Sequence, residues 1–134
     1  CTGGGIPQLI TEKVDSPFYI SGQKIIPVLV GHGDLKGCFG YRIGPLAYIP
    51  DMRTINDENI KKLEGTEILI LNCLRREKEH PTHLILPQSV ELARRISPRR
   101  CYFIHMCHDI HYELDSRSID PFMEFSRDGL KIEI

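Results

Sequence analysis

The sequence predicts a single α/β domain in which helices pack on a mixed β-sheet. Short β-prone runs joined by turn residues fill the first third of the chain, and two continuous apolar runs alternate with two amphipathic helices further on. The length of 134 residues suffices for one hydrophobic core of ordinary size. We therefore expect residues 1–134 to form one domain without internal repeats, beginning with a loop at residues 1–7.

Two hairpins are predicted in the first third of the chain. Residues 18–30 contain two β-prone segments that flank a Ser-Gly turn pair. Pro27 lacks the backbone N–H that a strand ladder needs, so its strand should lie at an edge or be bulged there. A second hairpin is expected to join residues 38–43 to residues 46–49 through a Gly-Pro pair.

The apolar period changes after residue 55 from that of strands to that of helices. Asn56 can cap a helix over residues 57–64, which has acidic residues in its first turn and lysines in its last, and Gly65 ends it. Residues 67–74 then form a continuous apolar run, which is typical of a strand covered on both faces.

The rest of the chain repeats this alternation. A loop is predicted at residues 75–86, a second helix at 87–96 and a second buried strand at 101–107. A closing hairpin is expected from residues 122–126 and 130–134, which flank an Asp-Gly turn pair. The predicted order is therefore hairpins, then helix, strand, helix and strand, then a last hairpin.

Charge and composition exclude several kinds of partner. The net charge is −1, with 17 basic and 18 acidic residues interspersed, so the chain lacks the basic stripe expected if nucleic acid or a membrane surface were its main partner. No apolar run approaches the roughly 18 residues of a membrane span. Five cysteines, most of them in apolar runs, favour reduced thiols and a cytoplasmic location. One basic cluster is predicted to be a solvated helix end rather than a phosphate-steering patch: Arg94, Arg95, Arg99 and Arg100.

Side chains that bind metals stand at or just past the ends of the apolar runs. Strand ends are where α/β sandwiches place their chemistry, because the rigid sheet holds the ligands while the loops stay open. Taken alone, Asp51 is explained as an ordinary turn-forming residue, and His32 as a residue of a turn, because it lies between two glycines. Together the residues indicate a metal site, since zinc and manganese prefer such ligands. The candidates are His32, Asp51, His80, His83, His105 and His108.

His105 is expected to be a buried histidine. Alternation along its predicted strand puts Cys101, Phe103 and His105 on one face, the packed one. A histidine buried there must be either hydrogen-bonded or bound to a metal.

Seven segments of the chain, taken in order, resemble the metallo-β-lactamase superfamily. They are Val30-Gly-His-Gly33, Gly40-Tyr-Arg-Ile-Gly44, Tyr48-Ile-Pro-Asp51, Leu69-Ile-Leu-Asn-Cys-Leu-Arg75, His80-Pro-Thr-His83, Tyr102-Phe-Ile-His-Met-Cys-His108 and Asp128-Gly-Leu-Lys-Ile-Glu133. The most similar branch holds the cyclic-phosphate phosphodiesterase of phosphonate breakdown, with ribonuclease Z as a cousin. The resemblance implies that the chain is the C-terminal part of a metallo-β-lactamase αββα sandwich.

The resemblance also implies a function and a set of metal ligands. It implies a metal-dependent hydrolase, a phosphodiesterase that acts on cyclic or nucleotide-like phosphodiesters. Two divalent cations, zinc or manganese, would occupy the complete site. His32 and His105 match metal ligands of this family, and Asp51 matches the carboxylate that bridges the two metals.

On the substrate side, the resemblance assigns roles to three further histidines. His83 resembles the histidine near the scissile phosphate, which would hydrogen-bond a phosphoryl oxygen or protonate the leaving alcohol. With Asp51 it would form the catalytic pair. His80 and His108 would lie beside the small phosphodiester substrate.

One part of the family pattern is missing from these 134 residues. The first metal motif, His-x-His-x-Asp-His, occurs nowhere in the sequence, so we expect this chain alone to hold one cation or none and to be inactive. Whether the chain is an enzyme by itself therefore stays open, and the alternative is a non-catalytic half-domain for interaction or oligomerisation. The expected partner is a second copy or a complementing N-terminal half. A metal-independent two-histidine phosphoesterase would need two His-x-Thr motifs, and the chain has one of them, at residues 80–82.

Overall fold

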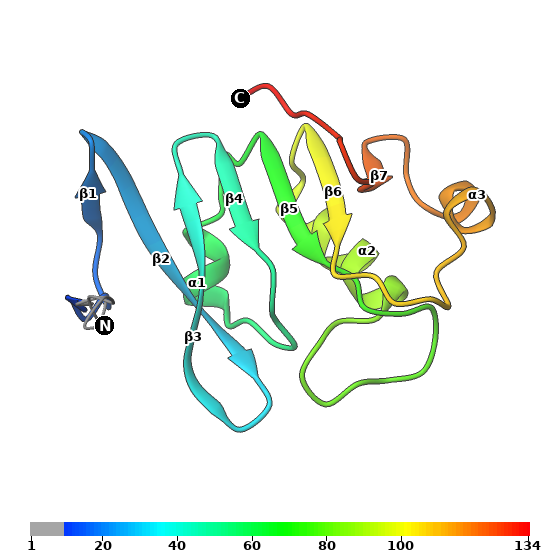
Figure 1. Ribbon diagram of the computed structural model, residues 1–134, viewed down its shortest axis with the longest axis horizontal. Coiled ribbons are helices and arrows are strands. Elements are labelled where there is room, and N and C mark those ends of the chain that lie inside the picture. The colour runs from blue at the N-terminus through cyan, green and yellow to red at the C-terminus, as the bar shows by residue number, and fades with distance from the viewer. Residues whose placement is uncertain (1–9) are drawn as a thin grey trace, which may run out of the picture.

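Seven strands form one mixed sheet in the computed structural model, which describes residues 10–134 (Figure 1). The loop predicted at residues 1–7 lies outside the described residues. The strands follow one another across the sheet in chain order, with β1 to β4 antiparallel and β4 to β7 parallel. Their bounds are β1 Phe18–Ile20, β2 Gln23–His32, β3 Leu35–Ile43, β4 Leu46–Ile49, β5 Ile68–Asn72, β6 Arg100–Ile104 and β7 Met123–Phe125.

Both hairpins predicted in the first third are confirmed. β1 and β2 turn at Ser21 and Gly22, which take positive φ angles of 48° and 80°, a conformation that glycine adopts without strain. β3 and β4 pair antiparallel across the Gly-Pro turn. β1 pairs only with Gln23–Ile25, so Pro27 lies where β2 extends past its outer neighbour, in agreement with an edge position.

The two predicted helices are present and lie behind the sheet in Figure 1. Helix α1, Asp57–Lys61, begins at Asn56, whose side chain accepts a hydrogen bond of 2.9 Å from the backbone N–H of Asn59. It ends three residues earlier than predicted, in a turn that closes at Gly65. Helix α2, Leu86–Ile96, begins one residue earlier than predicted.

The hydrophobic core fills the space between the sheet and these helices. The strand register brings its members side by side, since Leu71 pairs with Phe103 and Phe103 pairs with Phe125. The two phenylalanine rings lie 5.7 Å apart between centroids, a favourable aromatic contact. The core residues on this face are Val28, Ala47, Ile49, Leu69, Leu71, Cys101, Phe103, Met123 and Phe125.

The opposite face of the sheet carries a row of aromatic and aliphatic side chains that neither α1 nor α2 covers. The register places Tyr41 beside Tyr48, Tyr48 beside Ile70 and Ile70 beside Tyr102. Tyr48 is 40% exposed, which is unusual for a large side chain in the middle of a sheet. We refer to this row as the open face: Leu29, Phe39, Tyr41, Tyr48, Ile70 and Tyr102.

Two sequence predictions near the C-terminus are wrong. The predicted closing hairpin does not form, because β7 pairs parallel with β6 and residues 130–134 form no strand. Their alternating pattern predicts a strand only where a sheet edge is free to accept them. The strand predicted at 101–107 ends at Ile104, and a short helix α3, Tyr112–Asp115, with a 3₁₀ turn at Ser116–Ser118, follows it.

Candidate metal centre

The candidate residues gather at one edge of the sheet because their strands run in the same direction. β4, β5 and β6 are parallel, and β2 runs with them because both β2 and β4 are antiparallel to β3. His32 ends β2, Asp51 follows β4, and His105 follows β6. The loop between β5 and α2 brings His83 to the same edge. This edge holds the carboxyl ends of the strands, where α/β folds place their sites.

Gly31 fixes the end of β2 against the loop that carries Asp51. Its backbone N–H donates to the carbonyl of Thr54 at 2.8 Å, and its carbonyl accepts from the N–H of Arg53 at 2.7 Å. A Cβ at Gly31 would lie 2.2 Å from the Thr54 hydroxyl oxygen, a separation that no side chain tolerates. Glycine is therefore required for the close approach that positions His32 beside Asp51.

The residue after Asp51 ties its loop to the loop that carries His83. The carbonyl of Met52 accepts two hydrogen bonds of 3.0 Å, one from the backbone N–H of Leu84 and one from the side-chain amide of Asn72. Met52 and Asn72 are fully buried. Asp51 and His83 are thus each one residue away from a buried, hydrogen-bonded anchor, which limits how far their side chains can separate.

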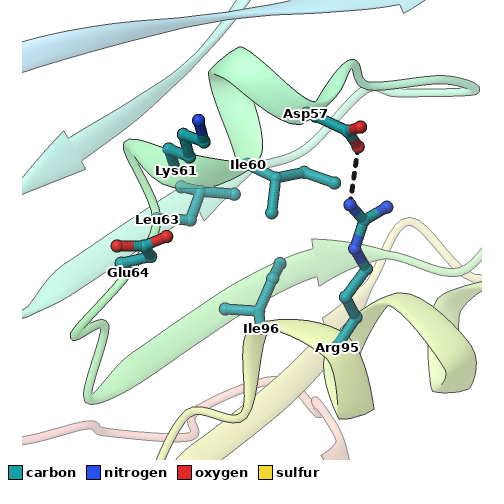
Figure 2. A pocket seen from close by; sticks show the side chains of 7 residues that line it. All are labelled: Asp57, Ile60, Lys61, Leu63, Glu64, Arg95 and Ile96. Atoms are coloured by element: carbon teal, nitrogen blue, oxygen red, sulfur yellow. Dashed lines mark hydrogen bonds and ion pairs between the residues drawn. The ribbon is translucent and has the colours of Figure 1, made fainter.

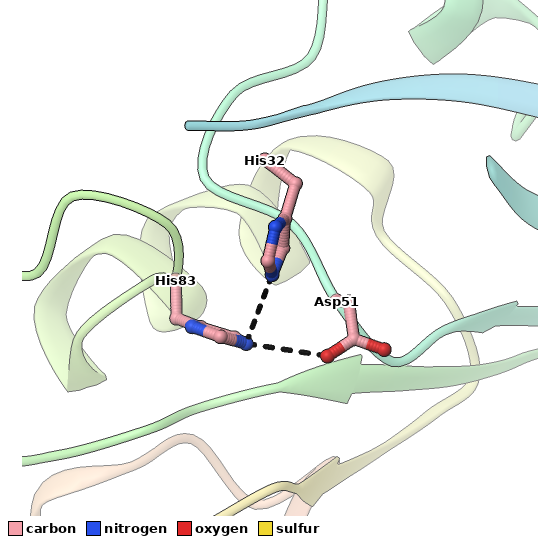
Figure 3. A group of neighbouring side chains, drawn as sticks. All are labelled: His32, Asp51 and His83. Atoms are coloured by element: carbon pink, nitrogen blue, oxygen red, sulfur yellow. Dashed lines mark hydrogen bonds and ion pairs between the residues drawn. The ribbon is translucent and has the colours of Figure 1, made fainter. Parts of the chain in front are cut away.

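Three of the sequence candidates meet with their ligand atoms within 4.8 Å of one another: His32, Asp51 and His83 (Figure 3). The Nε2 atom of His83 lies 3.2 Å from Asp51 Oδ1 and 3.3 Å from His32 Nε2. His105 joins the cluster, since its Nε2 atom lies 3.3 Å from the same carboxylate oxygen. The His83 ring lies between those of His32 and His105, with centroid separations of 4.7 Å and 4.4 Å.

This donor set fits a divalent cation. Around a tetrahedral zinc with bonds of about 2.0–2.1 Å, neighbouring ligand atoms lie about 3.3–3.4 Å apart. The separations of His83 Nε2 from Asp51 Oδ1 and from His32 Nε2, 3.2 Å and 3.3 Å, have that size, and the ligand atoms of all three residues lie within 4.8 Å of one another. Two imidazole nitrogens and a carboxylate oxygen are ligands that zinc and manganese accept.

His105 reaches the cluster by a route that the strand alternation did not predict. β6 ends at Ile104, whose carbonyl accepts a hydrogen bond of 2.8 Å from the N–H of Cys73. His105 then adopts a left-handed backbone with φ of 61°, so its side chain leaves the alternation of the strand and turns toward Asp51. The side chain is 41% exposed, so the prediction of a buried His105 was wrong. A strained backbone at a polar cluster is typical of functional sites.

His83 is the most buried histidine of the cluster, with 8% of its surface exposed. Burial lowers the pKa of His83 from its ordinary value of 6.5, and the neighbouring imidazoles of His105 and His32 act in the same direction. The hydrogen bond to Asp51 raises this pKa and offsets part of the effect. The imidazole of His83 is therefore neutral near pH 7, with one nitrogen available as an acceptor or ligand.

The structure brings His80 to the cluster but leaves His108 outside it. His80 Nδ1 lies 3.4 Å from His83 Nδ1, and their ring centroids are 5.3 Å apart. His108 is exposed and, in the described part of the chain, forms no hydrogen bond or ring contact with the other candidates.

Sequence reasoning missed two neighbours of the site. The Thr82 hydroxyl contacts both His80 and His83, and the Cys38 thiol lies 3.5 Å from the carbonyl of Asp51.

A separate hollow of about 380 Å³ lies between α1 and α2 (Figure 2). Apolar side chains, an ion pair of 2.6 Å between Asp57 and Arg95, and the charged residues Lys61 and Glu64 line it, and it shares no residue with the histidine cluster. The basic cluster near the end of α2 is neutralised by carboxylates, as a solvated helix end requires and a phosphate-steering patch does not. The pairs are Arg94–Asp120, Arg95–Asp57, Arg99–Glu67 and Arg100–Glu124.

Comparison with known proteins gives a consistent family assignment. Residues 6–106 match the family model described as "Beta-lactamase superfamily domain". A solved structure described as a new diphosphatase from the PhnP family is 38% identical with a TM-score of 0.84, over 89% of this chain and 46% of that chain. The metallo-beta-lactamase fold protein YhfI from Bacillus subtilis is 16% identical with a TM-score of 0.73, over 90% of this chain and 54% of that chain, and shows the fold alone.

A curated relative extends the comparison to a longer protein. The octanoyltransferase of Porphyromonas gingivalis is 31% identical over 132 residues, which make up 96% of this chain and 26% of that protein. The chain thus spans about half of the solved structures it matches and about a quarter of this relative. Among residues 10–134, no helix has the length and apolar character that a membrane crossing needs.

Proposed function

This chain belongs to the beta-lactamase superfamily, as its sequence motifs predicted, and from this premise we propose that its histidine–aspartate cluster is one side of a two-metal phosphodiesterase centre. The observation that carries the proposal is that Asp51 lies beside both histidines assigned to the metals: its Oδ1 atom is 3.3 Å from His105 Nε2, and its ligand atom lies within 4.8 Å of that of His32. A carboxylate close to ligands of two cations is placed to bridge them.

The residues present would hold the metals as two incomplete halves. Because the rings of His32 and His105 flank that of His83, His32 would serve one cation, His105 the other, and Asp51 both. Bound zinc or manganese would neutralise phosphate oxygens and lower the pKa of water. With three ligands divided between two positions, we propose that this chain alone holds one cation or none.

In the complete site, His83 would act on the substrate rather than on the metals. Its Nε2 atom faces the point where Asp51 and His32 meet, so it is placed to hydrogen-bond a phosphoryl oxygen or to protonate the leaving alcohol. A general acid in such a position contributes about 10²–10⁴-fold to the rate. His80 would lie beside the substrate, and His108 would have to reach it from the exposed rim.

The proposed substrate is a small phosphodiester, cyclic or nucleotide-like. A net charge of −1 and the pairing of the arginines near α2 support a small molecule over a nucleic-acid polymer. The description of the 38% identical neighbour as a diphosphatase supports a second candidate bond, the phosphoanhydride of a diphosphate ester. Both bonds place phosphate oxygens over the same metals, so one site can serve either class.

We further propose that a second polypeptide layer, either an N-terminal half or a second copy, completes the site. Two observations support this partner: the shortage of metal ligands and the open face, on which Leu29 is 44% and Tyr48 is 40% exposed. Burying such a row against a partner is favourable by about 25 cal/mol per Å² of apolar surface. The free thiols of Cys38, Cys73 and Cys101 support a reducing compartment such as the cytoplasm.

The proposal is tested by metal binding first and by turnover second. We expect the chain to bind at most one equivalent of zinc or manganese, Asp51→Asn to bind none, and Asp128→Asn, in an exposed turn, to bind as the parent does. When the chain is joined to the part of the PhnP-family diphosphatase that it does not match, two cations and hydrolysis of bis(p-nitrophenyl) phosphate or of a diphosphate ester should appear. If the parent chain binds a cation, unchanged binding in Asp51→Asn would sink the proposal, and so would a two-metal chimera that hydrolyses neither substrate.

A further inference from the structure

The hydroxyl of Thr82 lies between two imidazole rings. Its oxygen is 2.8 Å from His83 Nδ1 and 3.1 Å from His80 Nδ1. A hydroxyl has one proton, so Thr82 can donate to only one of these nitrogens at a time and must accept from any other partner. The side chain is half-buried, so water competes only in part for these positions.

The methyl group of Thr82 determines the direction of that hydroxyl. Gly33, in the turn directly after His32, has φ of 57°, and a Cβ there would lie 2.8 Å from the Thr82 methyl carbon. The methyl group therefore occupies the space that a side chain at residue 33 would need. With the methyl against the turn, the hydroxyl is held on the side of His80 and His83.

We infer that Thr82 is a positioning residue whose hydroxyl donates to Nδ1 of His83 and thereby keeps the proton of that ring on Nε2. This inference rests on the proposed function, in which His83 Nε2 hydrogen-bonds a phosphoryl oxygen or protonates the leaving group. A neutral imidazole carries its proton on one nitrogen, and the partner of the other nitrogen selects which one. The backbone N–H of Thr82 lies 3.4 Å from Nδ1 of His80 and donates to it, so the Thr82 hydroxyl is left to donate to Nδ1 of His83.

Two substitutions separate the hydroxyl from the shape of the side chain. Thr82→Val keeps the branched shape and the contact over Gly33 but removes the hydroxyl. Thr82→Ser keeps the hydroxyl and removes the methyl group. Thr11→Val makes the same chemical change at an exposed residue far from the cluster in sequence and serves as the control.

The tautomer is read first, in the metal-free 134-residue chain, from ¹⁵N chemical shifts of the histidine rings. We expect His83 to carry its proton on Nε2 in the parent, in Thr82→Ser and in Thr11→Val. In Thr82→Val we expect a mixture of tautomers with an unchanged urea midpoint for folding. A His83 protonated on Nδ1 in the parent would overturn the inference, and so would identical ring spectra in the parent and Thr82→Val.

Turnover in the two-metal chimera is the second readout. Thr82→Val should lower kcat by about 10–100-fold with little change in KM, and Thr82→Ser should retain most of the activity. An active chimera whose kcat is insensitive to Thr82→Val would overturn the role of the hydroxyl. If no chimera is active, the proposed function fails, whereas the ring spectra still decide whether Thr82 sets the tautomer.

Discussion

We expect His105→Gly to be more stable than His105→Ala, although both variants lose the imidazole. His105 is the residue that leaves β6 with φ of 61°, a conformation that costs an L-residue about 1–2 kcal/mol and glycine almost nothing. Glycine also loses more freedom on folding, which offsets about 0.4–1 kcal/mol of that gain. The free energy of unfolding should therefore be about 0.5–1 kcal/mol larger for the glycine variant than for the alanine variant.

Urea unfolding of the metal-free variants, followed by circular dichroism, measures this difference. His108 provides the matched control, since it is exposed, three residues further on, and outside the left-handed region. There the order should reverse, with glycine less stable than alanine by about 0.4–1 kcal/mol. If His105→Gly is equal to or less stable than His105→Ala, the backbone at the end of β6 is not strained and the argument is wrong. The comparison requires that the free energy of unfolding depend on urea concentration with the same slope in the variants compared.

Three further predictions follow from the same structure. Gly31→Ala should cost about 1–3 kcal/mol of stability, because its Cβ would lie 2.2 Å from the Thr54 hydroxyl, and adding Thr54→Ala should restore part of it, as urea midpoints would reveal. Phe103→Ala should cost about 3–5 kcal/mol of stability, because this fully buried ring packs against Phe125; a loss under 1 kcal/mol would contradict the central place of this ring in the core. Burial lowers the pKa of His83 below 6.5, so in the metal-free chain the unfolded state binds a proton at this histidine more readily than the folded state does. The free energy of unfolding should therefore fall as the pH drops below about 6.5, and it should fall less in His83→Gln. Parallel plots of this free energy against pH for the two proteins between pH 5 and 8 would contradict the prediction.

Local sequence chemistry was enough to predict most of the secondary structure. The Ser-Gly and Gly-Pro turns, the Asn56 cap and the two continuous apolar runs act over a few residues, so they could be read without knowing the fold. The closing hairpin was wrong for the complementary reason. Its second segment, residues 130–134, has a strand pattern, but a strand also needs a free edge to pair with, and that depends on the whole sheet.

The sequence also named the residues that meet at the candidate centre, but not how they meet. His32, Asp51, His83 and His105 were recognised because each follows an apolar run, and the family resemblance assigned their roles. That they converge depends on strand directions, which are fixed only when β2 and β4 both pair antiparallel with β3. Their metal and catalytic roles stay predictions.

What the tertiary structure alone decided are the contacts between residues distant in the chain. The left-handed backbone of His105 and the close approach of the Thr82 methyl group to Gly33 leave no periodic signal in the sequence. The sequence by itself determined which chemical groups this protein has and where most of its strands and helices lie. The separations of about 3 Å between His83 Nε2 and its neighbours Asp51 and His32 come from pairing and packing across the sheet, which hydrophobic periodicity does not encode.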